Sequence, residues 1–292
     1  VKDKKYLSAL AERVQKALDG PFTTCGIACK ITVSIGISLS SNEINNARDL
    51  LKQADIAMYH AKQKGKNRYH FFDQSMEKFL HERISFEEDL YFGLKNNEFH
   101  QVFQPIVNIK TDEVVGCEVL LRWNSKKRGT VSPANFIPLA ESLGLMLEID
   151  KWVFAQSLSF LKKFPLCGHF SINLSPIHFV QPTLLRTFLK SLKNLNPNLN
   201  VIFEVTETAI ISDIEKSSEV IKEIKSYGHS VAIDDFGTGY TSLYYLKVLS
   251  FDYLKIDKSF IQDMSSNDSS KVIVSAIINL ARELDIKVIA EG

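Results

Sequence analysis

Polar side chains interrupt or follow several short apolar segments in the second half of this 292-residue chain. These segments are rich in β-branched residues, which is typical of buried strands. The polar residues are carboxylates, one amide and one lysine: Glu118, Asn173, Glu204, Asp234, Asp235, Lys255 and Glu291. Burying a lone carboxylate is costly, so a group of six, Glu207 included, requires pairing, hydrogen bonds or bound cations.

The donor atoms in this set point to metal-assisted chemistry. Carboxylate oxygens and an amide carbonyl are the ligands that magnesium and manganese prefer. The set contains no histidine and no cysteine, which disfavours zinc. We therefore expect Mg²⁺ or Mn²⁺. Two such ions that clamp an in-line displacement at phosphorus are a known solution for phosphodiester hydrolysis.

The adjacent pair Asp234-Asp235 carries a geometric expectation. Consecutive residues of a strand point to opposite faces, so both side chains can reach one site only if the backbone leaves the regular strand there. The following segment, residues 236–240, supplies two glycines for such a turn. One aspartate would then serve a first metal ion and the other a second.

Each of these features also has a simpler structural explanation. Asp-Asp at a strand end can be a helix cap or a solvated turn, and Glu204 with Glu207 can form a capping device. Lys255 can make an ordinary ion pair, and Asn173 can cap the helix expected after Ser175-Pro176. These explanations weaken together, because every candidate falls at the same end of a successive strand.

The elements that must position these residues alternate between strands and helices. After a helix marked by Phe86, Leu90, Phe92 and Leu94, we predict seven strands at residues 101–109, 114–123, 170–174, 201–205, 230–233, 253–256 and 287–290. The later strands recur at the length of a βα unit and are apolar, as in parallel strands buried on both faces. In a barrel, the C-terminal ends of such strands converge on one mouth.

This pattern favours an α/β fold, a (β/α)8-type barrel, over an open sheet. The first two strands are separated only by residues 110–113, a turn that can join only antiparallel neighbours. An eighth strand is not in the sequence. The chain begins at Val1 and stops directly after the last apolar segment, so we interpret it as a fragment.

The first 74 residues are expected to form a separate, partial α/β domain. A helix is predicted at 5–18, a strand at 28–39, and a second helix from a cap near Asn46 to Lys64-Gly65. The predicted organisation is therefore a first domain at 1–74, a linker at 75–82 and the barrel at 83–292.

Composition narrows the functional class. The net charge is +1, so no general attraction to nucleic acid or membranes is implied, and an anionic ligand must be held by a local site. Cys25, Cys29, Cys117 and Cys167 form no CxxC pair, which favours reduced thiols in a cytoplasmic protein over disulfides. No apolar run approaches the roughly 18 residues of a membrane span, and no signal peptide is present.

Residues 83–292 closely resemble EAL domains, with many motifs in the family's order. The name motif is Glu118-Val119-Leu120, where valine replaces the family's alanine. The other matching segments are residues 103–106, 132–141, 173–175, 204–207, 234–240, 254–257 and 290–292. The family's last strand, with a glutamine near its active site, is missing, which leaves two open barrel edges.

The resemblance implies a phosphodiesterase that hydrolyses cyclic di-GMP to linear pGpG in bacterial second-messenger signalling. Glu118, Asn173, Glu204 and Asp234 match ligands of one metal ion, and Asp235 matches a ligand of the second. Lys255 would position or help activate the attacking water, and Glu291 would lie near the metal and the water. Glu207 would brace the loop after Asp235.

The same resemblance assigns substrate contacts to Gln104, Arg122 and Pro133. The planar fork of an arginine suits a phosphate. Relatives of this family often dimerise through the EAL domain, although the sequence does not fix the oligomeric state. It also does not identify the sensor domain expected upstream of Val1, nor show whether the parent protein is anchored to the inner membrane.

Residues 1–74 resemble the C-terminal part of a GGDEF domain. The matching segments are residues 32–37 and 54–67. The signature of that family lies upstream and is absent, and the chain contains no Gly-Gly pair. We therefore expect no diguanylate cyclase activity. For the barrel, two alternatives stay open: a cyclic di-GMP receptor without turnover, and a phosphodiesterase with a different substrate.

Overall fold

The computed structural model describes residues 3–24, 27–40, 46–164, 168–237 and 243–291. The chain divides into two compact units, Val1–Asp89 and Leu90–Gly292. Helix α3 (Gln74–Lys95) carries the chain from the first unit into the second. It includes residues 75–82, which the sequence predicted to be a linker, because nothing in this segment is a glycine or a proline that would end a helix.

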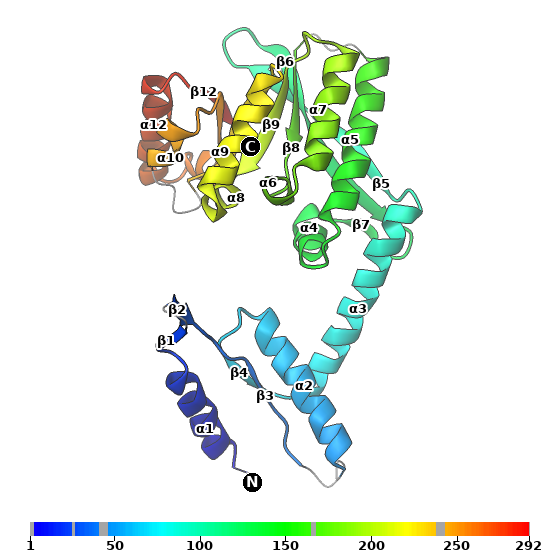
Figure 1. Ribbon diagram of the computed structural model, residues 1–292, viewed down its shortest axis with the longest axis vertical. Coiled ribbons are helices and arrows are strands. Elements are labelled where there is room, and N and C mark those ends of the chain that lie inside the picture. The colour runs from blue at the N-terminus through cyan, green and yellow to red at the C-terminus, as the bar shows by residue number, and fades with distance from the viewer. Residues whose placement is uncertain (1–2, 25–26, 41–45, 165–167, 238–242, 292) are drawn as a thin grey trace. The chain divides into compact units, whose positions relative to one another are not determined.

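The first unit combines helices with short strands (Figure 1). Its elements are α1 (Lys4–Ala17), β1 (Pro21–Thr24), β2 (Ile27–Lys30), β3 (Ile35–Ile37), α2 (Ala47–Gln63) and β4 (Tyr69–Phe71). Both predicted helices are confirmed. The Asn46 side chain accepts a hydrogen bond from the Asp49 backbone N–H at 2.8 Å, which caps α2, and Gly65 follows the helix at φ 106°.

The predicted single strand at 28–39 is wrong. Its first part, β2, pairs antiparallel with β1, whereas β3 pairs in parallel with β4, and residues 31–34 belong to no strand. A strand continues only while it has a hydrogen-bonding partner, and here the partner changes.

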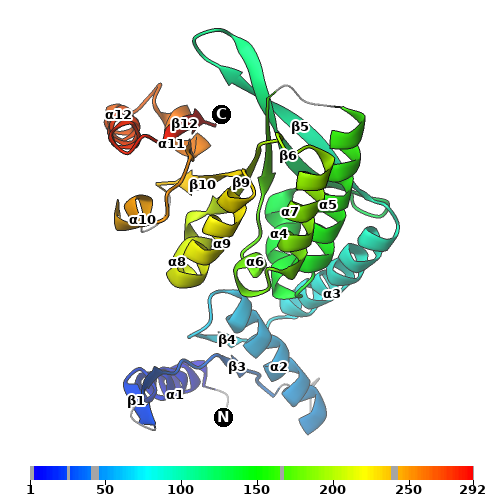
Figure 2. The same ribbon diagram turned by 45° about the horizontal axis from the view of Figure 1, so that its top comes forward.

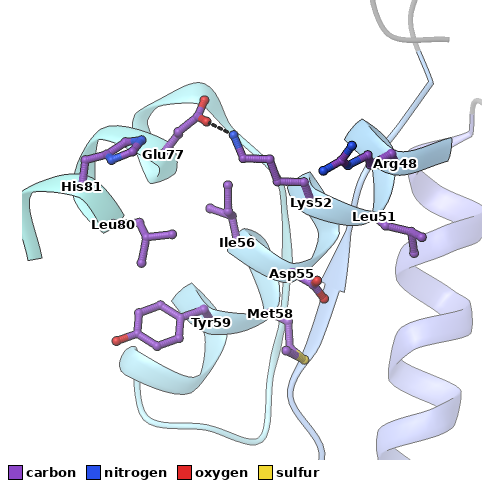
Figure 3. A pocket seen from close by; sticks show the side chains of 10 residues that line it. All are labelled: Arg48, Leu51, Lys52, Asp55, Ile56, Met58, Tyr59, Glu77, Leu80 and His81. Atoms are coloured by element: carbon purple, nitrogen blue, oxygen red, sulfur yellow. Dashed lines mark hydrogen bonds and ion pairs between the residues drawn. The ribbon is translucent and has the colours of Figure 1, made fainter. Parts of the chain in front are cut away.

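A surface hollow of about 590 Å³ lies between α2 and the first half of α3 (Figure 3). Its lining is mostly apolar and includes Ile56, Met58 and Leu80. The Lys52 Nζ lies 2.7 Å from Glu77 Oε1, so an ion pair joins the two helices at its edge.

The second unit is a curled sheet covered on its outer face by helices (Figures 1 and 2). Its strands are β5 (Phe99–Asn108), β6 (Glu113–Ser125), β7 (Gly129–Val131), β8 (His169–Asn173), β9 (Val201–Thr206), β10 (Ser230–Phe236), β11 (Tyr253–Ile256) and β12 (Lys287–Ala290). The order across the sheet is β12-β11-β10-β9-β8-β6-β5, and β7 pairs with β6. All seven predicted strands are confirmed.

The pairing within this sheet follows the predicted pattern. Strands β5 and β6 are antiparallel across the short turn between them, and neighbours from β6 to β12 are parallel. The fold is therefore of the (β/α) barrel type with an antiparallel first pair, as expected.

Helices connect successive parallel strands, as βα units require. They are α4 (Pro133–Ser142), α5 (Met146–Lys163), α6 (Ile177–Val180), α7 (Thr183–Leu195), α8 (Glu207–Ser212), α9 (Ile214–Ser226), α10 (Leu243–Val248), α11 (Lys258–Asp263) and α12 (Asp268–Glu283). Helix α7 shows how they pack. Leu185, Phe188, Leu189 and Leu192 recur at helical spacing and are all buried, and Phe188 stacks on Phe154 of α5 at 4.1 Å between ring centroids.

The two faces of the parallel strands carry different residues. On β9, Val201, Phe203 and Val205 belong to the core that packs against the helices, whereas Ile202 belongs to a separate cluster with Ala232 and Tyr253. Because side chains alternate along a strand, the residues two positions further on, Glu204, Asp234 and Lys255, share the inner face with that second cluster. The apolar cluster therefore forms a floor beneath the polar residues.

We expect Phe188→Ala to lower the free energy of unfolding of the second unit by about 3–5 kcal/mol, because it removes a buried ring from a close-packed core. Both tryptophans, Trp123 and Trp152, lie in this unit, so tryptophan fluorescence during urea unfolding follows it selectively. The control is Ile109→Ala, since Ile109 is 97% exposed. Similar losses in the two variants would contradict the assigned core.

Among the described residues, no helix combines the length and apolar character needed to cross a bilayer. Cys29 and Cys117 are free thiols. Cys25 and Cys167 lie outside the described residues.

Candidate active site

Lys255 lies at the centre of the polar group on the inner face. It is the third residue of β11 and only 1% exposed. Its Nζ lies 3.1 Å from Glu118 Oε2 and 2.7 Å from Glu204 Oε2. The same nitrogen lies 3.1 Å from Asp234 Oδ1 and 2.6 Å from Glu291 Oε1. Carboxylates from β6, β9, β10 and the end of β12 therefore meet at one ammonium group.

This environment fixes the charge of the lysine. Burial by itself would lower the pKa of Lys255, but the carboxylates of Glu204, Asp234 and Glu118 outweigh burial and raise it. In this arrangement Lys255 donates hydrogen bonds to Glu118 and Glu204.

Glu204 is the most deeply buried carboxylate of the group, at 1% exposed. One of its oxygens accepts a hydrogen bond from the Ser171 hydroxyl, and the other accepts from Lys255. Burial raises the pKa of Glu204 to about 8; Glu118 and Asp234 add to this effect, and Lys255 opposes it. Ser171 was not among the site residues predicted from the sequence. The available signal was alternation, because Ser171 is two residues before Asn173 and points to the same face.

Asn173 ends β8 and contacts the group through Glu118. Its Nδ2 donates to Glu118 Oε1 at 3.2 Å. The Leu174 N–H donates to the Glu204 carbonyl at 2.8 Å, which holds the end of β8 beside β9. Glu118 itself departs from the expected strand-end position, since β6 continues to Ser125. The strand runs past Glu118 because β5 pairs with it as far as Trp123, and β7 pairs with its last three residues.

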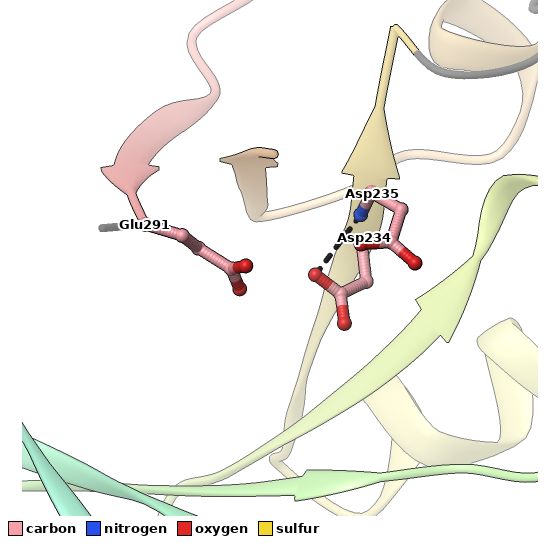
Figure 4. A group of neighbouring side chains, drawn as sticks. All are labelled: Asp234, Asp235 and Glu291. Atoms are coloured by element: carbon pink, nitrogen blue, oxygen red, sulfur yellow. Dashed lines mark hydrogen bonds between the residues drawn. The ribbon is translucent and has the colours of Figure 1, made fainter. Parts of the chain in front are cut away.

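The expectation that the backbone leaves the strand at Asp234-Asp235 is confirmed. The pairing of β10 with β11 shifts register between Ile233 and Phe236, and Asp235 has φ 53°. This bulge turns the second aspartate toward the first, and the Asp235 N–H donates to Asp234 Oδ1 at 3.0 Å (Figure 4). Of the glycines expected to permit the turn, Gly237 has φ 100°, and Gly239 lies outside the described residues.

Asp235 is half-buried and close to other acids. Burial raises the pKa of its carboxyl group, and Asp234 and Asp257 raise it further. Asp257 caps helix α11 by accepting a hydrogen bond from the Ser259 N–H at 2.9 Å. The second aspartate is therefore flanked by an acid on each side.

The carboxylates fit a divalent cation. Asp234, Asp235 and Glu291 each offer an oxygen, and these oxygens all lie within 4.8 Å of one another (Figure 4). Glu118 and Glu204 join the same group through Lys255. One lysine cannot neutralise five carboxylates, and oxygen donors with excess negative charge suit Mg²⁺ or Mn²⁺ better than softer metals.

The predicted metal ligands therefore lie close together in the structure. The sequence assigned Asp234 to one ion and Asp235 to another. In the structure the carboxylate oxygens of these two aspartates and of Glu291 all lie within 4.8 Å of one another, and their division between two ions stays a prediction.

Two of the three predicted substrate residues, Gln104 and Arg122, lie on the same face of the first two strands. Gln104 is paired directly opposite Glu118, and Arg122 is four residues further along β6, so alternation puts all three on the inner face. The Arg122 Nη1 donates to the Leu121 carbonyl at 2.9 Å. Pro133 is the first residue of α4.

Glu207 opens helix α8 and is 3% exposed. Neither of its carboxylate oxygens has a hydrogen-bond partner among the residues that the structure describes. Its predicted contact, the loop after Asp235, includes residues 238–242, which are not described. The bracing role of Glu207 therefore stays a prediction.

Comparison with known protein families gives a match for each part of the chain. A family model described as EAL domain matches residues 87–292. A second, described as Diguanylate cyclase, GGDEF domain, matches residues 1–68.

Among curated proteins, the chain is 35% identical over 291 residues to the bifunctional diguanylate cyclase/cyclic di-GMP phosphodiesterase MucR of Pseudomonas aeruginosa, covering 98% of this chain and 42% of MucR. It is 32% identical over 290 residues to the cyclic di-GMP phosphodiesterase NbdA of the same organism, covering 97% of this chain and 37% of NbdA. The chain therefore spans well under half the length of these two relatives.

Among solved structures, the PaMucR phosphodiesterase in complex with c-di-GMP superposes with a TM-score of 0.64 at 34% identity. The match covers 70% of this chain and 85% of that one.

Proposed function

The chain belongs to the EAL domain family, and on this basis we propose that its second unit hydrolyses cyclic di-GMP to linear pGpG in a metal-dependent reaction. Support comes from the relatives named as cyclic di-GMP phosphodiesterases and from the similar structure with c-di-GMP bound. The observation that carries the proposal is the convergence of four carboxylates on the buried Lys255. One of them is Asp234, and the bulge in β10 brings Asp235 next to it.

We assign the metal-binding role to Glu118, Asn173, Glu204, Asp234 and Asp235, with Glu291 close by. When bound, Mg²⁺ or Mn²⁺ would polarise the phosphate and lower the pKa of the attacking water. The donor chemistry supports this pair of metals without selecting between them.

The chain's own residues have distinct roles in this proposal. Lys255 is held as a cation, so it can donate a hydrogen bond that orients the attacking water or the phosphate oxygen it leaves. Arg122 and Gln104 share the inner face with Glu118, which suits contacts to the dinucleotide. Pro133 begins α4, and we keep it as a substrate contact from the family resemblance.

We further propose that the domains follow the predicted division, with a GGDEF part at 1–74 and the EAL domain from residue 83. The family matches, at 1–68 and 87–292, support this division. The GGDEF part lacks that family's signature, so we expect no cyclase activity from this chain. A homodimer through the EAL domain and a cytoplasmic location also stay predictions.

The test is turnover of cyclic di-GMP by this chain and by its parent protein, with product followed by liquid chromatography. We expect pGpG to form with Mg²⁺ or Mn²⁺ and to disappear when a chelator is added, because the excess carboxylates need divalent cations to bind a phosphate. A panel with cyclic di-AMP provides the control for substrate.

Two results would contradict the proposal. Calorimetric binding of cyclic di-GMP without product over hours would favour a receptor without turnover. A preference for cyclic di-AMP would keep the metal-dependent chemistry and overturn the assigned substrate.

A further inference from the structure

A second buried polar pair, His178 and Asp150, joins α6 to α5 and has no role in the proposed reaction. The His178 Nε2 lies 2.9 Å from Asp150 Oδ2. His178 is 0% exposed and Asp150 is 5% exposed. A polar pair at this depth is costly unless both partners are well placed, so its position in the fold is informative.

We propose that this pair is a positioning device that holds the turn carrying Asn173, and so sets the metal affinity of the site. The inference rests on the proposed function, because it takes Asn173 as a metal ligand. Neither His178 nor Asp150 touches the reacting groups, so both would act only through the turn.

The short helix that follows Asn173 requires outside support. Helix α6 contains only four residues, Ile177–Val180, and begins four residues after Asn173. A single helical turn is unstable by itself, because fixing its backbone gains too few hydrogen bonds. Its backbone bonds are local: the His178 N–H donates to Ser175 and the Phe179 N–H to Pro176, each at 3.1 Å.

Two side chains of α6 supply that support. Phe179, 4% exposed, packs into the main core, and His178 bonds to Asp150 in the first half of α5. Apolar packing lets a short helix slide or rotate, whereas a hydrogen bond is directional. The His178 ring also stacks on Phe154 at 5.5 Å between centroids, and the His178–Asp150 bond adds the directional contact that orients α6.

Helix α5 is a suitable support because it is itself tied to the sheet. Gln101 of β5 donates to the Val153 carbonyl at 3.0 Å and to the Ser157 hydroxyl at 3.1 Å, both on α5. Phe154 of the same helix stacks on Phe188 of α7. Hydrogen bonds thus join β5 to α5, and α5 to His178 of α6.

The other end of the turn is tied to the site. The Leu174 N–H donates to the Glu204 carbonyl at 2.8 Å, and Asn173 Nδ2 donates to Glu118 at 3.2 Å. Asn173 is exposed, so packing alone does not hold its side chain. If α6 rotated, the Asn173 amide would move away from Glu118, and both groups would lose their orientation toward a cation.

Within the part of the chain that the structure describes, only one of the two ring nitrogens of His178 makes a hydrogen bond, so a side chain with one suitably placed N–H can replace it in a rescue variant. Nδ1 has no hydrogen-bond partner among the described residues, so only Nε2 is used. The side-chain N–H of glutamine occupies a place similar to that of Nε2 and can donate to Asp150. Leucine at this position has a similar volume and no donor.

The test compares His178→Leu, His178→Gln and Phe179→Leu in the intact chain. Mn²⁺ binding is measured without substrate by the electron paramagnetic resonance signal of free Mn²⁺, and thermal unfolding is measured by tryptophan fluorescence. We expect His178→Leu to weaken Mn²⁺ binding about tenfold, as loss of a group that orients metal ligands does. We expect His178→Gln to restore it to near the wild-type value.

Phe179→Leu is the matched control, because it loosens the packing of the same helix without touching the hydrogen bond. It should lower the melting temperature and leave Mn²⁺ affinity unchanged. Equal loss of melting temperature in the two leucine variants, with unchanged Mn²⁺ affinity in both, would overturn the proposal.

If His178→Leu does not fold, Asp150→Asn replaces it, since asparagine keeps an acceptor but loses the charge. We then expect a loss of Mn²⁺ affinity of roughly threefold, smaller than the roughly tenfold expected for loss of the whole bond, because the acceptor is kept. Unchanged affinity overturns the inference. Failure of the proposed function can be told apart from failure of this inference. If the wild type shows no turnover but the variant at His178 or Asp150 binds Mn²⁺ more weakly, the phosphodiesterase activity is rejected and the positioning role is retained.

Discussion

Replacing Lys255 by methionine is expected to lower kcat for cyclic di-GMP hydrolysis by about 10²–10³-fold, the range for losing one preorganised charged donor at a reaction centre. The variant keeps an unbranched chain of similar length on β11 but removes the cation that contacts Glu118, Glu204, Asp234 and Glu291. The measurement is the initial rate of pGpG formation at saturating Mn²⁺.

The same substitution should destabilise the metal-free protein. Removing one partner from a buried ionic group costs about 3–5 kcal/mol, because the remaining charges are left uncompensated. A divalent cation supplies the missing positive charge, so Mn²⁺ should raise the melting temperature of Lys255→Met more than that of the wild type. This difference separates electrostatic loss from a simple packing defect.

The matched control for this variant is Lys225→Met. Lys225 also bonds a carboxylate, Asp252, at 2.9 Å. Asp252 precedes β11, so this contact lies at the N-terminal end of that strand, away from the acidic group. We expect normal turnover and no added response to Mn²⁺. An unchanged melting temperature of metal-free Lys255→Met would show that Lys255 is not the principal counter-charge of the carboxylates.

Replacing Glu118 by alanine is expected to reduce kcat/KM by about 10³-fold, or roughly 4 kcal/mol of transition-state stabilisation. Glu118 is bonded to both Lys255 and the Asn173 amide, so its loss removes a proposed metal ligand and also releases a second one. Its side chain is 15% exposed, so the fold should tolerate the change better than it tolerates loss of the fully buried Glu204.

Glu113→Ala is the control for that experiment. Glu113 is the first residue of the same strand and is exposed. Its removal should leave both turnover and Mn²⁺ affinity unchanged. Intact turnover in Glu118→Ala would reject the role assigned to Glu118.

Many of the elements and the irregular backbone at the site could be predicted from local sequence. The strands were predictable because each is a short β-branched segment bounded by polar residues, and βα spacing separates the later ones. The irregular backbone at Asp235 was predictable because two adjacent carboxylates cannot face one site from a regular strand. The cap of α2 at Asn46 follows equally local rules.

The errors and omissions have a common physical origin, which is contact with residues distant in sequence. Residues 28–39 split into two strands because β2 and β3 have different partners. Glu118 lies within its strand because β5 pairs with that strand as far as Trp123. Ser171 and His178 were not selected from the sequence, because their partners lie on other elements. Ser171 bonds Glu204 of β9, and His178 bonds Asp150 of α5.

The sequence by itself determined which residues could bind a cation and on which strands they would lie, since residue type and strand periodicity are local properties. Only the tertiary structure decided how those residues meet. Lys255 bonds Glu118 across 137 positions and Glu204 across 51, and no local preference encodes such distances. They are set by strand order and register, which depend on packing of the whole sheet against its helices.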